Sequence, residues 1–412
     1  MPRRIRLWRV VKRILVGLVI TQLVALAGLV GLESWRKRIR PQRGHFPRTP
    51  PTELSAGDTD VTVYTYGDDL YRDMLSAIRT ARRRVLFESF IVKGDEVGRQ
   101  FKQELVAAAE RGVDVYVIYD GFANLVVPPS FFWFPPSVRV LRYPALRPGA
   151  LLLNIRKSGR DHRKILTVDG HTGFVGGYNI GSLYATKWRD THLRLVGPSV
   201  WELENAFADF WNMHRSPNQP RIAAEGAAPW APDIRAYRNV PEQLIYPIRA
   251  MYLEAIDRAK DHVLITQAYF VPDREFRDAL IAAAQRGVNV RILVPESSNH
   301  VIPDWLSRGL YTQLLRGGVS IWLFRDAMIH AKTATIDGRW STVGTANVDR
   351  LSLTGNYEIN LEIFDEKVAA HLERVFASDT TNARPVSLAE WEQRSLIARL
   401  GEALVRPLRP LL

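Results

Sequence analysis

Two segments of this chain begin with histidine and share one pattern. Residues 162–169 read HRKILTVD, and residues 330–337 read HAKTATID, 168 residues later. A histidine can attack phosphorus, and a lysine ammonium can hold phosphate oxygens. One such segment would mean little, but two segments with the same spacing indicate that the chain contains two copies of a set of residues suited to binding and attacking phosphate. The matched pairs are His162 and His330, Lys164 and Lys332, and Asp169 and Asp337.

The register continues beyond these segments without a gap. An asparagine amide can donate to phosphate oxygens, so we expect Asn179 and Asn347 to bind phosphate. A carboxylate follows each histidine by 28 residues, and carboxylates commonly orient an imidazole. We therefore interpret Asp190 and Glu358 as the histidine-orienting pair. Further matches at the same offset are Gly176 with Gly344 and Leu183 with Leu351.

Asp169 and Asp337 are also candidates for the catalytic set, but each is followed by glycine. An Asp-Gly pair is typical of a tight turn, so a turn role is favoured for them over direct chemistry. The alternating apolar residues between histidine and aspartate predict a strand. On such a strand His and Lys would share a face, and a second strand would return each asparagine to the histidine end.

The repeat extends to secondary structure. In the first half, helical patterns over 70–81 and 97–111 alternate with apolar runs at 85–92 and 113–119. The second half repeats this order, with helices expected over 248–259 and 275–286 and strands over 263–271 and 288–294. This alternation predicts an α/β fold of two similar sandwich halves. Packing with pseudo-twofold symmetry would bring both histidines into one site, with a nucleophile on one side of phosphorus and a proton donor on the other.

We expect six segments along the chain. They are an N-terminal membrane anchor (1–41), a linker (42–58), the first half (59–215), an inter-half linker (216–241), the second half (242–386) and a C-terminal amphipathic tail (387–412). The linkers are suggested by stretches rich in Pro, Gly and Ala or Arg. The tail, with Leu396, Leu400 and Arg399 at helical spacing, is expected either on an anionic membrane surface or docked on the protein.

The net charge of +13 favours polyanionic partners, either nucleic acid or an anionic lipid surface. The apolar run Ile14 to Leu32 lacks charge and is just long enough to cross a hydrocarbon core of about 30 Å. It is flanked by basic residues and by Trp8 and Trp35, which favours a single-pass anchor over a cleaved signal peptide. A phospholipid partner, and not nucleic acid, is therefore expected.

The absence of cysteine excludes disulfides, thiolate metal sites and a cysteine nucleophile. No metal-binding motif is apparent, and lysine can supply the positive charge, so we expect neither a metal nor another cofactor.

With its HxKx4D segments followed by Gly and Asn, the chain resembles the phospholipase D superfamily over residues 60–412. Within it, the segments 188–192 (WRDTH), 268–272 (AYFVP), 343–349 (VGTANVD) and 356–358 (NYE) are similar to those of bacterial cardiolipin synthases. Where the superfamily often has Gly-Ser, this chain has Gly176-Gly177 and Gly344-Thr345. Only Thr345 keeps a hydroxyl for phosphate.

The resemblance implies metal-independent transfer through a phosphohistidine at the cell membrane. It implies that His162 attacks one phosphatidylglycerol and that His330 protonates the departing glycerol, although the residues alone leave the order of the two open. Lys164, Lys332, Asn179 and Asn347 would hold the phosphate. A hydrolase of phospholipid or nucleic acid, and a binding protein with a decayed site, are the alternatives; the intact motifs argue against the last.

Overall fold

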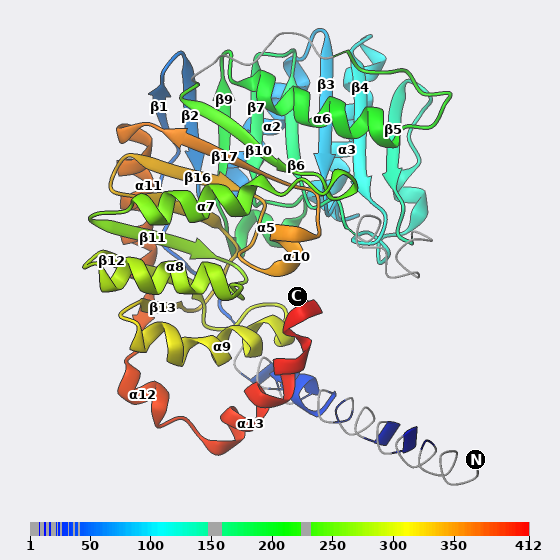
Figure 1. Cartoon of the computed structure of the whole chain (residues 1–412). Helices are drawn as coiled ribbons and strands as arrows, with labels where there is room; N and C mark the ends of the chain where they lie inside the picture. Colours follow the sequence, from blue (N-terminus) through cyan, green and yellow to red (C-terminus); the bar gives the residue numbers. More distant parts are fainter. Residues whose placement is uncertain are drawn as a thin grey trace.

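The computed structural model describes residues 42–146, 159–223 and 232–411, with scattered residues before 42. Two mixed eight-stranded sheets form its body (Figure 1). The predicted apolar span at residues 14–32 lies largely outside the described residues. Among the residues that are described, no helix is both long and apolar enough to cross a membrane.

The first sheet has the strand order β1-β2-β9-β7-β6-β3-β4-β5. It contains β1 (Thr52–Ala56), β2 (Thr59–Tyr64), β3 (Arg84–Ser89), β4 (Asp114–Asp120), β5 (Val138–Tyr143), β6 (Lys164–Val168), β7 (Thr172–Gly176) and β9 (His192–Val196). The second sheet has the order β10-β17-β16-β15-β11-β12-β13-β18. It contains β10 (Ile234–Asn239), β11 (His262–Gln267), β12 (Asn289–Pro295), β13 (Ser320–Phe324), β15 (Lys332–Ile336), β16 (Trp340–Gly344), β17 (Glu358–Phe364) and β18 (Ala383–Pro385).

Helices cover both faces of each sheet because the central strands are apolar on both sides. In the first half, Val85 and Phe87 pack with α2 (Gly67–Thr80) and α3 (Glu96–Glu110), while Leu86 packs with α6 (Val200–His214). In the second half α7, α8 and α9 lie on the outer face and α11 on the inner face. Their bounds are α7 (Pro247–Arg258), α8 (Arg274–Gln285), α9 (Val301–Arg316) and α11 (Glu366–Thr380).

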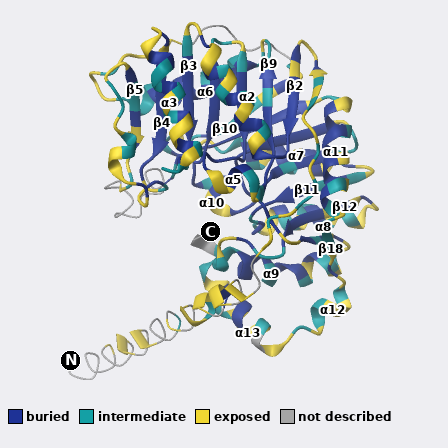
Figure 2. Ribbon diagram, turned by 180° about the vertical axis from the view of Figure 1, so that it is seen from behind, coloured by how far each residue is buried: buried dark blue, intermediate teal, exposed yellow. Residues whose placement is uncertain are grey.

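The two halves meet through the inner faces of their sheets. Val175 and Leu193 of the first half share one apolar cluster with Val343 and Leu361 of the second. Figure 2 shows these strands as buried beneath the helices. A short parallel pair, β8 (Trp188–Arg189) with β14 (Met328–Ile329), also joins the halves. Two short helices, α5 (Ser182–Thr186) and α10 (Arg350–Thr354), occupy equivalent positions in the repeat.

The linker predictions differ in part from the structure, whereas the tail is helical and docks on the protein. β1 lies within the predicted linker 42–58, and β10 lies within the predicted linker 216–241; both are edge strands whose polar residues gave a weak pattern. In the tail, α12 (Leu388–Glu392) is followed by α13 (Leu396–Val405) and the 3-10 helix η4 (Arg406–Leu411). α13 packs closely on α9, since a Cβ on Gly401 would lie 2.5 Å from the Trp305 ring.

The aromatic segment at residues 131–134 is mainly a packing element. It begins within the 3-10 helix η1 (Pro129–Phe132), where Phe132 stacks on Tyr119 with ring centroids 4.0 Å apart. Phe131 and Phe134 are also partly buried against the first core cluster. Only Trp133 in this segment is largely exposed, at 74%.

Candidate active site

Each histidine lies just before a strand and is fixed by the opposite half. The predicted strands begin later than expected, at Lys164 in β6 and at Lys332 in β15. The backbone N–H of His162 donates to the carbonyl of Tyr357 at 3.0 Å, and that of His330 donates to the carbonyl of Arg189 at 2.6 Å. These reciprocal bonds are what a pseudo-twofold arrangement requires, and they bring both histidines to the inter-half interface.

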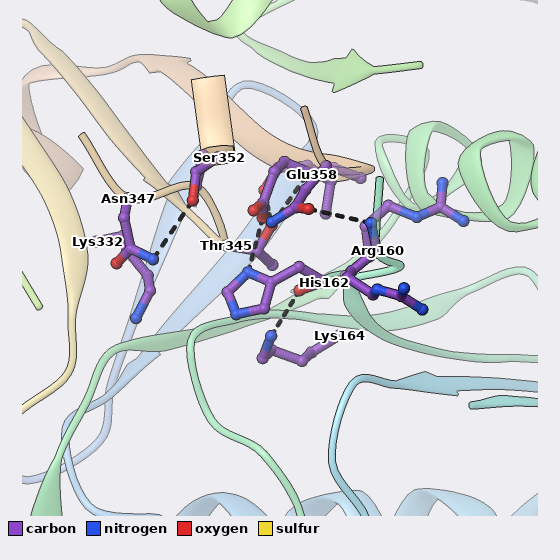
Figure 3. Close-up of polar contacts among 12 residues, drawn as sticks. Arg160, His162, Lys164, Lys332, Thr345, Asn347, Ser352 and Glu358 are labelled. Carbon is purple, nitrogen blue, oxygen red and sulfur yellow. Dashed lines mark hydrogen bonds and ion pairs between the residues drawn. The ribbon is translucent and has the colours of Figure 1, made fainter. Parts of the chain in front are cut away.

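The orienting carboxylates cross between the halves. Nδ1 of His162 lies 2.9 Å from Oε2 of Glu358, as Figure 3 shows. Nδ1 of His330 lies 2.6 Å from Oδ2 of Asp190. Because Nδ1 is engaged in both rings, Nε2 is the nitrogen that remains for chemistry. Each imidazole is therefore held in one orientation by a carboxylate from the other half of the chain.

The two lysines are buried next to the histidines. Nζ of Lys164 donates to the carbonyl of His162 at 2.5 Å, and Nζ of Lys332 donates to the carbonyl of His330. Figure 3 places both lysines around His162, with Lys332 beside Asn347. Burial lowers the pKa of Lys164 to about 7 and that of Lys332 to about 8. Both lysines can thus carry charge near neutral pH, where a bound phosphate would favour the ammonium form.

Burial also governs the histidines and carboxylates. It lowers the pKa of His162 well below the usual value and that of His330 to about 3, with the neighbouring lysines adding to the effect. Burial raises the pKa of Glu358 to about 7. Asp190 differs: burial alone would raise its pKa, but His330, Lys332 and a backbone N–H outweigh that effect and lower it. The two histidine–carboxylate pairs are therefore electrostatically unequal.

The support behind each carboxylate also differs. Thr345 Oγ1 donates to Oε2 of Glu358 at 2.5 Å, so its hydroxyl is used to hold the carboxylate and not, in this state, to bind phosphate. The equivalent residue Gly177 leaves room for Asp190, because a Cβ there would lie 2.1 Å from Oδ1 of Asp190. The second half therefore combines the longer carboxylate of Glu358 with Thr345, whereas the first half combines the shorter carboxylate of Asp190 with Gly177.

Both asparagines are buried. Oδ1 of Asn179 accepts a hydrogen bond from the backbone N–H of Ile91 at 3.1 Å, which leaves its amide hydrogens available to a ligand. Nδ2 of Asn347 lies 3.5 Å from the hydroxyl of Ser352. Their positions are compatible with the phosphate contacts predicted for them.

Asp169 and Asp337 lie in turns and make structural contacts. Both have positive φ, 56° and 53°, as a tight turn before glycine requires. The Asp169 carboxylate accepts three backbone N–H groups, from Arg82, Arg83 and Arg84. Asp337 accepts the equivalent three, from residues 260 to 262. These contacts support the turn role that the following glycines favour over direct chemistry.

Aromatic residues that the sequence analysis did not single out border the histidines. The ring centroid of Phe90 lies 4.6 Å from that of His162. Trp188 and Tyr269 lie 5.0 and 6.2 Å from His330. Trp188 and Tyr269 lie in the segments 188–192 and 268–272 that carry the family resemblance, whereas Phe90 lies outside those segments. In the described part of the chain, no group of three or more His, Asp or Glu side chains could hold a metal ion.

Comparisons with known proteins show which proteins this chain resembles. The family described as "Cardiolipin synthase, PLD-like domain" matches residues 74–211 and 252–380. A cardiolipin synthase of Staphylococcus aureus (strain Mu50 / ATCC 700699) is 32% identical over 383 residues, covering 86% of this chain and 74% of the relative. The major cardiolipin synthase ClsA of Bacillus subtilis (strain 168) is 33% identical over 373 residues, covering 86% and 76%.

Solved structures share the fold at low sequence identity. Phosphatidylserine synthase from Haemophilus influenzae Rd KW20 superposes with a TM-score of 0.66 at 16% identity, covering 91% of this chain and 96% of that one. Polyphosphate kinase from Porphyromonas gingivalis has a TM-score of 0.53 at 14% identity, with coverage of 88% and 56%. Both likenesses concern the fold alone. With two matched segments, one in each half, the chain belongs to the phospholipase D-like cardiolipin synthase family.

Proposed function

We propose that this protein is a phosphatidyltransferase that joins two phosphatidylglycerol molecules into cardiolipin and releases glycerol. The observation that carries the proposal is the crossed site: two imidazoles, each held at Nδ1 by a carboxylate of the other half, beside two buried lysines. This arrangement suits double displacement at phosphorus, which needs a nucleophile, a proton carrier and positive charge for the oxygens.

The reaction proceeds in two balanced steps. In the first, Nε2 of His162 attacks phosphorus of one phosphatidylglycerol, the bond from phosphorus to the glycerol oxygen breaks, and His330 gives that oxygen a proton. In the second, a hydroxyl of another phosphatidylglycerol attacks phosphorus. His330 takes the hydroxyl proton, the bond to His162 breaks, and cardiolipin leaves. Lys164, Lys332 and the two asparagines stabilise the charge on the non-bridging oxygens.

The unequal carboxylates support this assignment of the two histidines. Asp190 has a lowered pKa and stays ionised beside His330, so it stabilises the imidazolium that an acid needs. The pKa of Glu358 is raised to about 7, so Glu358 stabilises positive charge on His162 less. His162 therefore remains neutral and nucleophilic, while the negative charge of a bound phosphate raises the pKa of His330 toward the working range.

The membrane is the expected location of this reaction. The uncharged run at residues 14–32, with basic residues on both sides, supports a single-pass anchor in the cell membrane. Gln22 Nε2 donates to the carbonyl of Leu404 in α13 at 3.4 Å, so described N-terminal residues lie against the C-terminal helix. Leu396 and Leu400, at 74% and 69% exposure, extend this apolar region on α13. Such a surface suits the interface of a bilayer.

The test is product analysis with the full-length protein in vesicles of labelled phosphatidylglycerol. Cardiolipin and glycerol in equal amounts are expected. Phosphatidic acid as the only lipid product would replace the proposal with its alternative, a phospholipase D-type hydrolase in which water attacks the same intermediate.

The roles of the two histidines are tested with phosphatidylglycerol labelled at phosphorus. After denaturation, the wild-type protein should retain a phosphorus label that is labile in acid and stable in alkali, and His162→Ala should not. Turnover should be lost in both His162→Ala and His330→Ala. The exposed His171→Ala is the matched control and should keep both. Label retained by His162→Ala would assign the nucleophile to another residue.

A further inference from the structure

The two halves differ at one pair of equivalent positions beside the site. Histidine, lysine and asparagine recur at the offset of 168 residues. Two residues after each asparagine, however, the first half has Gly181 and the second half has Asp349. In the proposed reaction one histidine bonds phosphorus and the other exchanges protons with the alcohol, so a difference between the two halves is of interest.

The backbone around these two residues is the same in both halves. Val92 pairs with Ile180 in an isolated parallel bridge, and Phe270 pairs with Val348. The next residue in each case donates its backbone N–H to the same partner: Lys93 to Ile180 at 2.9 Å, and Val271 to Val348 at 2.8 Å. Lys93 is therefore equivalent to Val271, and Gly181 to Asp349.

These two pairs of equivalent positions carry different ionisable side chains. The half-buried side chain of Lys93 lies over Gly181, since a Cβ on that glycine would lie 2.8 Å from Cγ of Lys93. In the second half the apolar Val271 replaces the lysine, and the carboxylate of Asp349 replaces the glycine. The first half thus has a lysine at this place with the carboxylate of Asp95 also close, since Oδ2 of Asp95 lies 3.3 Å from the same Cβ position. The second half has a carboxyl group without a lysine over it, and burial raises the pKa of Asp349 to about 7.

Asp349 is fixed and belongs to the His330 side. It is 9% exposed, and its Oδ1 accepts the backbone N–H of Ser352 at 2.7 Å. Its charge acts on Lys332 and on Tyr269, whose ring lies next to His330. The hydroxyl of Ser352 also hydrogen-bonds to Asp349. A carboxylate has about four lone-pair sites, so the two bonds from Ser352 leave capacity for a further hydroxyl donor.

We infer that Asp349 accepts a hydrogen bond from the non-reacting hydroxyl of a glycerol headgroup and so selects the alcohol on the His330 side. The inference rests on the proposed function, in which His330 exchanges a proton with that alcohol. An anionic phosphate is repelled from Asp349 and held by the lysines, whereas glycerol offers a second hydroxyl that water and simple alcohols lack. A buried acceptor left without this donor disfavours those competitors.

The test is a competition on one intermediate. Full-length protein in phosphatidylglycerol vesicles receives 1-propanol, and the ratio of cardiolipin to phosphatidylpropanol is measured. Asp349→Asn keeps the size and the helix-capping oxygen of aspartate, and Asp349→Ser keeps a capping oxygen, so both should fold. Both should lower the ratio by about tenfold or more, the loss expected for a hydrogen bond to a charged acceptor.

The matched control is Asp365→Asn. Asp365 caps α11 in the same way, with Oδ1 2.8 Å from the N–H of Val368, at the end of β17 remote from Glu358. Its ratio should equal that of the wild type. If Asp349 had a structural role alone, its variants would form less of both products in the same proportion. An unchanged ratio in both variants would overturn the inference while the proposed function stands. A wild type that makes no cardiolipin would overturn both.

Discussion

Glu358 holds the imidazole of His162, a residue 196 positions earlier in the other half of the chain, at 2.9 Å. Asp190 does the same for His330, at 2.6 Å. Each half therefore supplies a histidine and a lysine to its own side and a carboxylate to the opposite side. Neither half contains a complete site, so assembly of the inter-half interface and assembly of the catalytic machinery are one event.

The crossed contact predicts that Glu358→Gln is severely impaired although glutamine has almost the same shape. The amide cannot balance charge on His162, and its NH2 group can favour the wrong tautomer. The kcat/KM for phosphatidylglycerol should fall by about 10²- to 10⁴-fold, the range for loss of a histidine-orienting carboxylate. Glu362→Gln on the same strand, where Glu362 accepts from Trp340 at 2.8 Å, is the control and should stay within a few-fold. Near-normal rates in Glu358→Gln would contradict the assignment.

The buried lysines predict a loss of activity at alkaline pH. The pKa values of Lys164 and Lys332 are lowered by burial to about 7 and about 8, so the ammonium forms are present below those values and are lost as pH rises through them. The pKa of Glu358 is raised to about 7, so its negative charge appears as Lys164 begins to lose its proton and helps Lys164 stay charged. Deprotonation of Lys332 therefore determines the fall in activity at alkaline pH. Accordingly, kcat/KM measured from about pH 5 to about pH 10 should fall with an apparent pKa near 8. A rate that still rises above pH 9 would be inconsistent with charged lysines as phosphate ligands.

Asp169→Ala should weaken the fold and leave the chemistry intact. Removing an acceptor of three backbone N–H groups should cost about 2 kcal/mol. Partial burial opposes ionisation, but these hydrogen bonds outweigh it and lower the pKa of Asp169. Its stabilising effect is therefore present above the ordinary carboxyl pKa and is lost as pH falls through the lowered value. Thermal unfolding in detergent, with the exposed Asp257→Ala as control, measures the change; a large drop in rate for fully folded enzyme would return Asp169 to the catalytic set.

Gly177→Ala should impair catalysis by displacing Asp190 from His330. The added Cβ would lie 2.1 Å from Oδ1 of Asp190, so the carboxylate must move. We expect kcat to fall at least about tenfold, since small displacements of a catalytic group are costly. Thr345→Ser at the equivalent position keeps the hydroxyl that bonds Glu358 and should remain close to the wild type. Equal rates in the two variants would show that Asp190 tolerates the displacement.

The repeated pattern of residues determined the fold class and the membership of the site. Apolar runs bounded by glycine predicted the central strands and their helices because those patterns are local, and the matches of β3, β4, β11 and β12 are close. The doubled register predicted which histidines, lysines, asparagines and carboxylates belong together. The sequence predicts linker segments where the edge strands β1 and β10 lie, because short polar strands carry little periodicity.

Only the tertiary structure decided which carboxylate serves which histidine. Asp190 and Glu358 have the same spacing from their own histidines, so the sequence is equally compatible with contacts inside a half and contacts between halves. Docking of the two inner sheet faces selects the crossed pairing. The burial that results from this docking also lowers the pKa values of the two histidines and the two lysines. It also brings Asp349 within electrostatic reach of Lys332 and Tyr269, because desolvation and proximity arise from packing between residues far apart in the chain.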